Sequence, residues 1–532
     1  MAAPYAAQEV QKIPVKIVGG NNFGRYSKIS VEETFNMIVS DNALVDYAGY
    51  KSVLTIAPTG RGRGIYSSSR ASIIIEVIGS QVYKISNALT ATFIGTLATS
   101  TGEVFIAENN GGEIGITDKV NIYIYDYQLN TFKVSGVDFV FTYSFTFSPG
   151  YISFQNGRFL VAALGTTNWV LSDFNDGTTW PNDAQHIGEL QTKPDSVQAV
   201  VPMPGGGNVA FVFGKNVTEK WTDIGAALFP YQKASTFNID YGCINATTIA
   251  ELENMIVWLA VNEQSGVVVM TCNGGAIKQI STDGIDFKLS QLVAPQNCSA
   301  FLFKQDGHLI YQFTFIADNL TYLYDFNTGL FFTATDEDND YHIARKVVLF
   351  NNKYYFTSIN GGNLYAMGTQ YTNYEYAPDD IKQIPRIRVT EPFRLPDSAP
   401  YIARKLTFTI ENGQPNTYTE YERDIIGDEL TLATEGGDDI TTEGGVLISA
   451  EQDANNSVNV ITLSQAAIDL SISRDGGETF GTSFRYNMQP TGRRRSILNY
   501  QRLGRANDCS MQLKFIGFER FVCFDGELEI YK

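Results

Sequence analysis

Residues that commonly carry out catalysis or bind metals are sparse in this chain. Its only histidines are His186, His308 and His342, so a histidine base or a histidine-based metal site is a poor candidate. No Ser/His/Asp or Cys/His set can be selected from the sequence. The cysteines form no C-x-x-C pair, and their odd number predicts reduced, buried thiols; they are Cys243, Cys272, Cys298, Cys509 and Cys523. We therefore expect no catalytic residue, no cofactor and no metal site.

The most specific short motif reads SRDGGETF and begins at Ser473. It fits the Asp-box pattern S-x-D-x-G-x-T-[WF], a hairpin stapled by its own side chains. The serine and aspartate bond backbone amides in the turn, a glycine supplies a positive φ, and the aromatic ring packs beneath. A degraded copy, FNDGTTW, covers residues 174–180. We predict a structural role for the box residues Ser473, Asp475, Gly477, Thr479 and Phe480.

Asp-boxes also occur in sialidases, which raises the alternative of a sialidase-like glycosidase. Those enzymes hold the substrate carboxylate with arginines from different blades, because planar guanidinium groups pair bidentately with a carboxylate. Between Ala71 and Ala344 this chain contains one arginine, Arg158. The sequence therefore favours a protein that is not an enzyme.

Basic charge is concentrated in the stretch GRRRSILNYQRLGRA. The chain as a whole has 39 Lys and Arg against 57 Asp and Glu, a net charge of −18, so this local reversal is informative. A solvated turn, a contact with acidic surface on a neighbouring subunit, such as residues 422–453, and a contact with DNA phosphate are the alternatives. We expect a subunit contact, made by Arg493, Arg494, Arg495, Arg502 and Arg505.

The composition favours a β protein of more than one domain. The chain has 532 residues, 13% of them aromatic, together with 47 glycines for turns. The N-terminus lacks a basic start followed by an apolar run, and no stretch of about 18 uncharged apolar residues occurs. We expect no signal peptide and no membrane insertion by this chain.

One pattern recurs from about Tyr50 to Met367: a short apolar strand, a turn of Gly, Asn or Asp, and a second apolar strand. The copies end near Ile85, Val134, Trp180, Trp221, Ile280, Phe332 and Met367. This spacing, roughly 35–60 residues, is the scale of a four-stranded propeller blade, and radial packing lets each sheet cover its neighbour. The pattern predicts a β-propeller of about seven blades at residues 50–370.

The flanking segments differ from the propeller pattern. Residues 1–49 read as an N-terminal arm, and residues 371–532 as a β-sandwich-like platform domain that the arm joins. An insertion near residues 422–460 carries ten acids against one base, Arg423, which is half of the net negative charge. Its role is left open by the sequence.

Three stretches in register resemble the packaged-DNA stabilisation proteins of short-tailed bacteriophages, also called tail hub or nozzle proteins. Near the N-terminus the resemblance rests on KIVGGNNFGRYSKISVEETFNMIVSD and GRGRGIYSSSRASIIIEVIGSQVYKI. In the middle, F-P-[YF]-Q, [YR]-G-C and W-L-[AG] elements correspond to Phe229–Gln232, Tyr241–Cys243 and Trp258–Ala260. At the C-terminus DLSISRDGGETFG, RRRSILNYQRLGRA and MQLKFIG fall in the family's order. The acidic insertion is a departure from the family pattern.

The resemblance implies a structural virion protein of the tail. It would form a homo-oligomeric ring, a hexamer, below the portal and adaptor, retain packaged DNA and serve as a conduit for genome ejection. Fibre, spike or plug proteins would attach to it, and viral DNA would pass through the lumen without sequence-specific binding. An acidic bore agrees with this, because it repels phosphates and lets DNA slide. A receptor-binding or decoration propeller of a virion is the remaining alternative.

Overall fold

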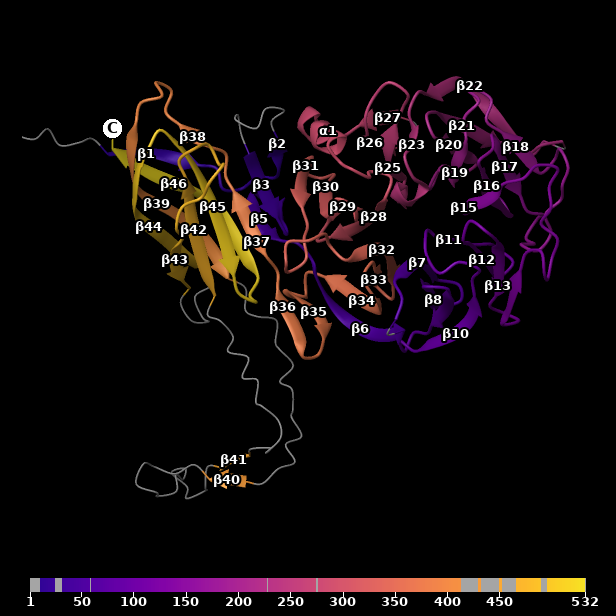
Figure 1. Cartoon of the computed structure of the whole chain (residues 1–532), viewed down its shortest axis with the longest axis horizontal. Helices are drawn as coiled ribbons and strands as arrows, with labels where there is room; N and C mark the ends of the chain where they lie inside the picture. The colour runs from indigo at the N-terminus through magenta and orange to yellow at the C-terminus, as the bar shows by residue number, and fades with distance from the viewer. Residues whose placement is uncertain are drawn as a thin grey trace, which may run out of the picture.

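The computed structural model describes residues 10–23, 31–57, 59–226, 228–273, 276–412, 429–431, 449–451, 466–488 and 495–531. Within these residues the chain is almost entirely β, with one α-helix, α1 (Asp283–Ser290), and one 3-10 turn, η1 (Ala246–Thr248). Figure 1 shows a wheel of sheets on one side and a layered pair of sheets on the other. The predicted all-β fold with a β-propeller is confirmed.

The first four sheets of the wheel are separate four-stranded antiparallel units in chain order. They are formed by β7 (Gly62–Ser68), β8 (Ile73–Ile78), β9 (Gln81–Ile85) and β10 (Ala91–Thr96); β11 (Phe105–Glu108), β12 (Glu113–Thr117), β13 (Ile122–Asp126) and β14 (Thr131–Val134); β15 (Ser148–Gln155), β16 (Arg158–Leu164), β17 (Asn168–Leu171) and β18 (Ile187–Glu189); and β19 (Val197–Pro202), β20 (Val209–Gly214), β21 (Thr218–Asp223) and β22 (Tyr231–Ile239).

The remaining sheets of the wheel are joined to other strands or have an extra short strand. They are formed by β23 (Gly242–Cys243), β24 (Ala250–Leu252), β25 (Met255–Val261), β26 (Val268–Asn273) and β27 (Ala276–Gln279); β28 (Cys298–Gln305), β29 (His308–Phe315), β30 (Leu320–Asp325) and β31 (Leu330–Thr333); and β32 (Ala344–Phe350), β33 (Lys353–Ser358) and β34 (Gly362–Gly368).

The wheel closes through a strand from before the first sheet. β6 (Gly49–Ala57) pairs antiparallel with β34, from Gly49 opposite Gly368 to Ala57 opposite Gly362. β32 also contacts β7, so the innermost strands of the last and first sheets are neighbours. A hairpin of β35 (Asn373–Ala377) and β36 (Asp380–Gln383) extends the last sheet beyond β6. Pairing between distant parts of the chain therefore holds the ring shut.

Some repeat units extend one strand further than the sequence pattern indicated. The copies expected to end near Ile85, Trp180 and Trp221 continue into β10, β18 and β22. These outermost strands are more exposed than the strands they pair with: β10, for example, has one buried residue in six. Their hydrophobic alternation is weak because they cover the rim, so the sequence pattern did not reveal them.

Apolar side chains between neighbouring sheets form the propeller core. Ile75 and Val77 of β8 pack in one cluster with Ile114 and Ile116 of β12, and all four are fully buried. Residues two apart on a strand face the same side, so each sheet presents one such row to each neighbour. Burial is worth roughly 1.5–3 kcal/mol for each large aliphatic side chain.

Two further sheets pack face to face outside the wheel. One has the order β4–β5–β46–β39–β44 with β1 beside β46, and the other continues from β31 through β3, β37, β45 and β42 to β43, with β2 beside β3 and β38 beside β45. The strands are β1 (Val10–Val15), β2 (Asn22–Phe23), β3 (Val31–Phe35), β4 (Met37–Ser40), β5 (Ala43–Asp46), β37 (Arg386–Val389), β38 (Phe393–Arg394), β39 (Tyr401–Asn412), β42 (Ala467–Ser473), β43 (Phe484–Asn487), β44 (Arg495–Ala506), β45 (Asp508–Ile516) and β46 (Phe521–Tyr531). β40 (Glu429–Thr431) and β41 (Ser449–Glu451) pair only with each other.

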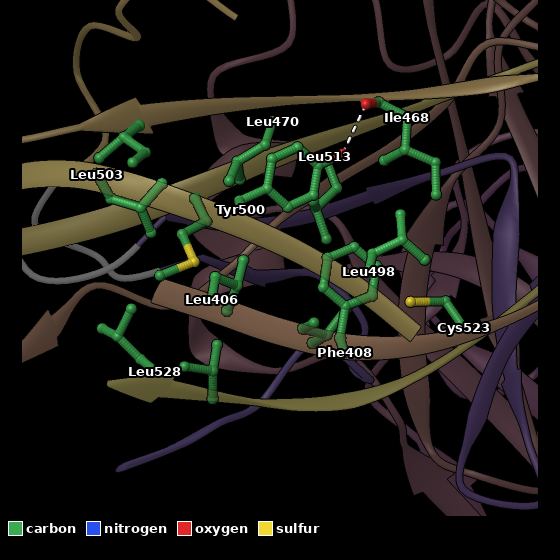
Figure 2. Close-up of a cluster of buried hydrophobic side chains, with 14 of the residues drawn as sticks. Leu406, Phe408, Ile468, Leu470, Leu498, Tyr500, Leu503, Leu513, Cys523 and Leu528 are labelled. Atoms are coloured by element: carbon green, nitrogen blue, oxygen red, sulfur yellow. Dashed lines mark hydrogen bonds between the residues drawn. The ribbon is translucent and has the colours of Figure 1, made fainter. Parts of the chain in front are cut away.

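The core of this sandwich lies between its two sheets. Figure 2 shows Leu406, Phe408 and Leu498 from one sheet facing Leu470 and Leu513 from the other. The Tyr500 hydroxyl donates to the carbonyl of Ile468 at 2.6 Å, so this buried polar group is satisfied. The predicted β-sandwich-like second unit is confirmed, while the domain boundaries stay a prediction.

Candidate functional site

A buried arginine joins the N-terminal segment to the sandwich. Arg388 of β37 is fully buried, and its Nε donates to the carbonyl of Ile17 at 2.6 Å. Its Nη1 donates to the carbonyl of Gly20 at 3.2 Å and to Thr34 Oγ1 at 3.0 Å, and its Nη2 pairs with Glu32. Burial lowers the pKa of Arg388, and Glu32 opposes that shift. A planar guanidinium with five donors can fix several chain segments at once.

A second buried arginine, two residues earlier, acts at the propeller side. Arg386 Nε lies 2.8 Å from Asp46 Oδ1, and its other nitrogens donate to the carbonyls of Gly517 and Thr372 at 3.1 and 3.0 Å. Asp46 Oδ2 also accepts from the backbone amide of Phe521 at 3.2 Å. Burial raises the pKa of Asp46, and Arg386 opposes the rise. The two arginines thus hold β37, the N-terminal segment and the last propeller sheet together.

The β4–β5 hairpin contacts the propeller through a chain of three polar side chains. Ser40 Oγ lies 3.0 Å from His308 Nε2, and His308 Nδ1 lies 2.9 Å from Asp325 Oδ2. Asp325 is fully buried, and His308 is nearly so. A pocket of about 390 Å³ adjoins Ser40 and His308, with Asp41 and Asp306 among its lining residues. The sequence did not group these residues, because they lie 268 and 17 positions apart.

This order of contacts is that of a Ser–His–Asp triad, but the surroundings do not suit acyl transfer. Asp325 already accepts from the amide of Asn327 at 2.9 Å and from the hydroxyl of Thr328 at 2.7 Å, as a turn-stabilising aspartate does. The carboxylates of Asp41 and Asp306 line the pocket together with Arg520, whose Nη2 already pairs with Asp306 Oδ2 at 3.3 Å instead of standing free to stabilise an oxyanion. We interpret the three residues as a fastener between hairpin and propeller.

The Asp-box lies between β42 and β43, in the sandwich. Gly477 N donates to Ser473 Oγ at 2.8 Å, and Thr479 N donates to Asp475 Oδ1 at 3.0 Å. Gly477 has φ +99°, and Phe480 is half-buried. The hydrogen bonds from Ser473 and Thr479 hold the pKa of the Asp475 carboxyl well below its usual range. These bonds staple a turn and leave no group placed for catalysis.

The degraded copy makes the same kind of staple in the propeller. Asp176 Oδ1 accepts from the amide and the hydroxyl of Thr178 at 2.8 and 2.7 Å, and Trp180 Nε1 donates to the carbonyl of Gly177 at 2.7 Å. Two hairpins in different sheets are therefore stabilised by the same kind of hydrogen bond between a side chain and a nearby amide.

The structure divides the predicted arginine cluster. Arg493 and Arg494 lie outside the described residues. Arg495 begins β44, with its guanidinium 5.8 Å from the ring centroid of Phe524, whereas Arg502 and Arg505 lie near the end of the strand. At about 3.3 Å per residue, the seven residues from Arg495 to Arg502 span roughly 23 Å. The arginines are exposed on one strand but do not form one patch.

Two β-bulges build a basic pocket at the Arg502 end, with residues that the sequence analysis missed. Between Ala403 and Lys405 the register of β39 shifts against both β44 and β46. Arg404, Lys405 and Arg502 line the resulting pocket of about 440 Å³, together with Ile402, Ala403, Gln501, Gly504 and Tyr531. The adjacent basic residues of ARK could have indicated a bulge, because strict alternation would have buried one of them.

The cysteines and the remaining possible metal ligands form no further site. All five cysteines are buried and unpaired, as predicted, and burial raises the pKa of Cys243 to about 12. Within the described residues, no group of His, Cys, Asp and Glu could hold a metal ion. The described part of the chain also contains no helix long and apolar enough to cross a membrane.

The fold and these contacts define an all-β structural protein, a propeller fastened to a sandwich with a basic pocket on its outer face. Residues 30–371, more than half of the chain, match the family described as Bacteriophage P22 Gp10, beta-propeller (Phage_stabilise). The chain belongs to this family. It is a structural protein of the bacteriophage tail that stabilises packaged DNA, and it resides in the virion, as the sequence predicted.

Solved propellers share only a distant likeness with this chain. Virginiamycin B lyase from Staphylococcus aureus is 12% identical, with a TM-score of 0.42, and the match covers 60% of this chain and 99% of the lyase. The β-propeller domain of Cps50 (Swd1) from Myceliophteria thermophila is 8% identical, with a TM-score of 0.40 and coverages of 60% and 99%. These scores carry no argument about function. A comparison with curated proteins gave no match.

Proposed function

We propose that this chain is the tail hub, or nozzle, of a short-tailed bacteriophage. Six copies form a ring below the portal and adaptor, retain the packaged genome, conduct it during ejection and anchor fibre, spike or plug proteins. The family match carries the proposal. It begins at residue 30, so it includes β3, β4 and β5, the strands that connect the propeller to the sandwich.

The fastened junction supports this role. A ring that withstands packaged DNA needs subunits in which the propeller and the platform keep a fixed relative position. The buried contacts of Arg386 contribute to this, because its guanidinium donates to the carbonyl of Thr372, beside the last propeller sheet, and to that of Gly517 in the sandwich. Arg388 fixes the N-terminal segment to the sandwich. In this proposal the propeller has seven blades and residues 50–370, the sandwich spans residues 371–532, and the arm of residues 1–49 joins the sandwich.

Charge supports passage of DNA without adhesion. The chain has a net charge of −18, half of it from the acidic insertion near residues 422–460, and this charge repels phosphate. Arg495, Arg502 and Arg505 lie on β44, and Arg404 and Lys405 lie on the neighbouring strand β39. We assign Arg495, Arg502 and Arg505 to contacts between subunits, and likewise Arg493 and Arg494, which precede Arg495 in the sequence.

Labelling of whole particles tests the proposal. A gold-binding tag at the C-terminus, in particles that remain infectious, is expected to mark the tail axis directly below the capsid in electron micrographs. Particles that lack the chain are expected to lose packaged DNA. Gold at the distal ends of fibres would instead support the receptor-binding or decoration propeller and overturn the hub assignment.

A further inference from the structure

The pocket on the outer face of the sandwich gathers positive charge that a regular sheet would divide between two faces. On β39, Ala403 pairs with Ile530 of β46 and Lys405 pairs with the adjacent Glu529, so Arg404 is an extra residue without a partner on β46. The side chains of Arg404 and Lys405 therefore both lie on the outer face. On β44, Gln501 and Arg502 are both exposed for the same reason, and Arg502 has a left-handed φ of +61°. Bulges re-aim side chains at functional surfaces.

Two cations of the pocket lack a counter-ion. Arg404 Nη1 lies 3.4 Å from Glu529 Oε2, and its guanidinium lies 5.5 Å from the ring centroid of Tyr531. The side chains of Lys405 and Arg502, by contrast, make neither a hydrogen bond nor an ion pair with any residue in the described ranges. In a chain with a net charge of −18, unpaired cations gathered in a 440 Å³ hollow favour a ligand that brings carboxylates.

The same chain contains a segment with the required chemistry. Residues 433–446 read ATEGGDDITTEGGV and contain four acids and no base. The paired aspartates Asp438 and Asp439 follow Gly436 and Gly437, which have no side chain to prevent close approach of the backbone. Two adjacent carboxylates match the two unpaired cations in number.

We propose that the pocket of Arg404, Lys405 and Arg502 binds the acidic segment 433–446 of a second copy of this chain. That a second copy lies within reach depends on the ring given above as the proposed function. In the described part of the chain, the β40–β41 hairpin that flanks this segment pairs with no other strand, and Figure 1 places it well away from β39 and β44. The segment of a neighbour is the occupant that the ring of the proposed function supplies, and the mixing experiment below separates it from the chain's own segment.

Direct binding is tested with a labelled peptide of residues 433–446 and the full-length protein, followed by fluorescence anisotropy. Because each exposed ion pair contributes modestly, the double variant Lys405→Glu/Arg502→Glu is expected to weaken binding by about tenfold or more, and added salt to weaken it for the wild type. A peptide with amides in place of its four carboxylates is expected not to bind. Equal binding of both peptides would overturn the proposal.

The matched control reverses two exposed lysines of the propeller, Lys215→Glu/Lys353→Glu, which changes the net charge by the same amount. It is expected to bind the peptide as the wild type does. A loss equal to that of the pocket variant would show a general charge effect and contradict the pocket. Circular dichroism of each variant confirms that the fold is retained.

A mixing experiment separates binding between copies from binding within one copy. Chains with Lys405→Glu/Arg502→Glu, and chains with Asp438→Lys/Asp439→Lys, are each expected to fail to form rings alone in mass photometry. Mixed together, they are expected to assemble in alternation, because each pocket then meets a segment of opposite charge. Rescue only when all four substitutions are in one chain would show binding within the chain and overturn the proposal.

The outcomes also distinguish this proposal from the ring itself. Normal rings from the pocket variant would contradict the role of the pocket in assembly, while the proposed hub function would be unaffected. A wild-type chain that stays monomeric in solution and in particles would contradict the hub, while the peptide measurement would still decide whether the pocket binds the segment.

Discussion

Between Ala71 and Ala344 the chain contains a single arginine, whereas thirteen of its nineteen arginines follow residue 370. The propeller is held by apolar rows between sheets, by its closing strand β6 and by one buried guanidinium near its start, that of Arg63, which donates to four backbone carbonyls. The sandwich has an apolar core too, but its edges and junction are built with guanidinium groups, some fully buried and some without a partner in the described residues.

This difference separates two tasks. In the wheel, repeated apolar sheets cover one another, so much of its burial comes from one repeated pattern. Fastening the wheel to a second unit, and that unit to its neighbours, needs directional contacts, which arginine provides. The comparison shows that buried arginines join distant segments of this chain, and it agrees with the proposal that the exposed ones make contacts between subunits.

The largest expected effect comes from removing the buried guanidinium of Arg388. Replacing Arg388→Ala leaves Glu32 buried without its cation, which typically costs about 3–5 kcal/mol. We expect the sandwich to unfold before the propeller, so that calorimetry shows two transitions in place of one. Lys12→Ala, which removes an exposed pair with Glu527, is the control, with an expected cost of about 1 kcal/mol or less. Equal costs for the two variants would contradict the assigned role of Arg388.

Acid is expected to act on the propeller through His342. Burial lowers its pKa to about 3, and its Nδ1 accepts from Gln312 Nε2 at 3.1 Å and from the amide of Ala344 at 3.3 Å. A proton on Nδ1 would point at both donor groups, so both hydrogen bonds would be lost. The unfolded chain binds this proton below about pH 6.5 and the folded chain does not, so stability falls as the pH falls through that range.

From pH 7 to pH 4 this histidine is expected to remove about 3 kcal/mol of unfolding free energy. Burial raises the pKa of Glu76 to about 8 and that of Glu251 to about 7, and both contributions oppose the loss as the pH falls. His342→Gln is therefore expected to remove the histidine's share, measured as the difference between variant and wild type in urea titrations at each pH. An unchanged slope would show that other groups cause the acid sensitivity. The sandwich core, which has no histidine, supplies the comparison within the same molecule.

The sequence predicted the repeats well and the contacts poorly, for a physical reason. Blades such as β11–β14 are formed by consecutive strands, so their apolar alternation can be recognised in one continuous stretch of sequence. The junction depends on pairs such as Arg388 and Glu32, which are 356 positions apart, and no local pattern encodes such a contact. The pocket depends on bulges, which shift the side-chain register by backbone geometry that alternation alone does not reveal.

The smallest expected effect tests the fastener reading of Ser40, His308 and Asp325. Ser40→Ala removes one hydrogen bond, which is worth about 0.5–1.5 kcal/mol. We expect a small loss of stability and no covalent labelling of the wild type by a fluorophosphonate probe in intact-mass spectra. Stoichiometric labelling of Ser40, lost in His308→Ala, would mean that the residues are catalytic after all.

The most direct test of the central claim is an image of the purified, full-length chain by cryo-electron microscopy under conditions that favour assembly. We predict a closed ring of six copies with an open central bore, in which every propeller keeps one orientation relative to its sandwich and adjacent sandwiches meet at the face of β39 and β44. Single subunits whose propeller and sandwich take up varying orientations would contradict it.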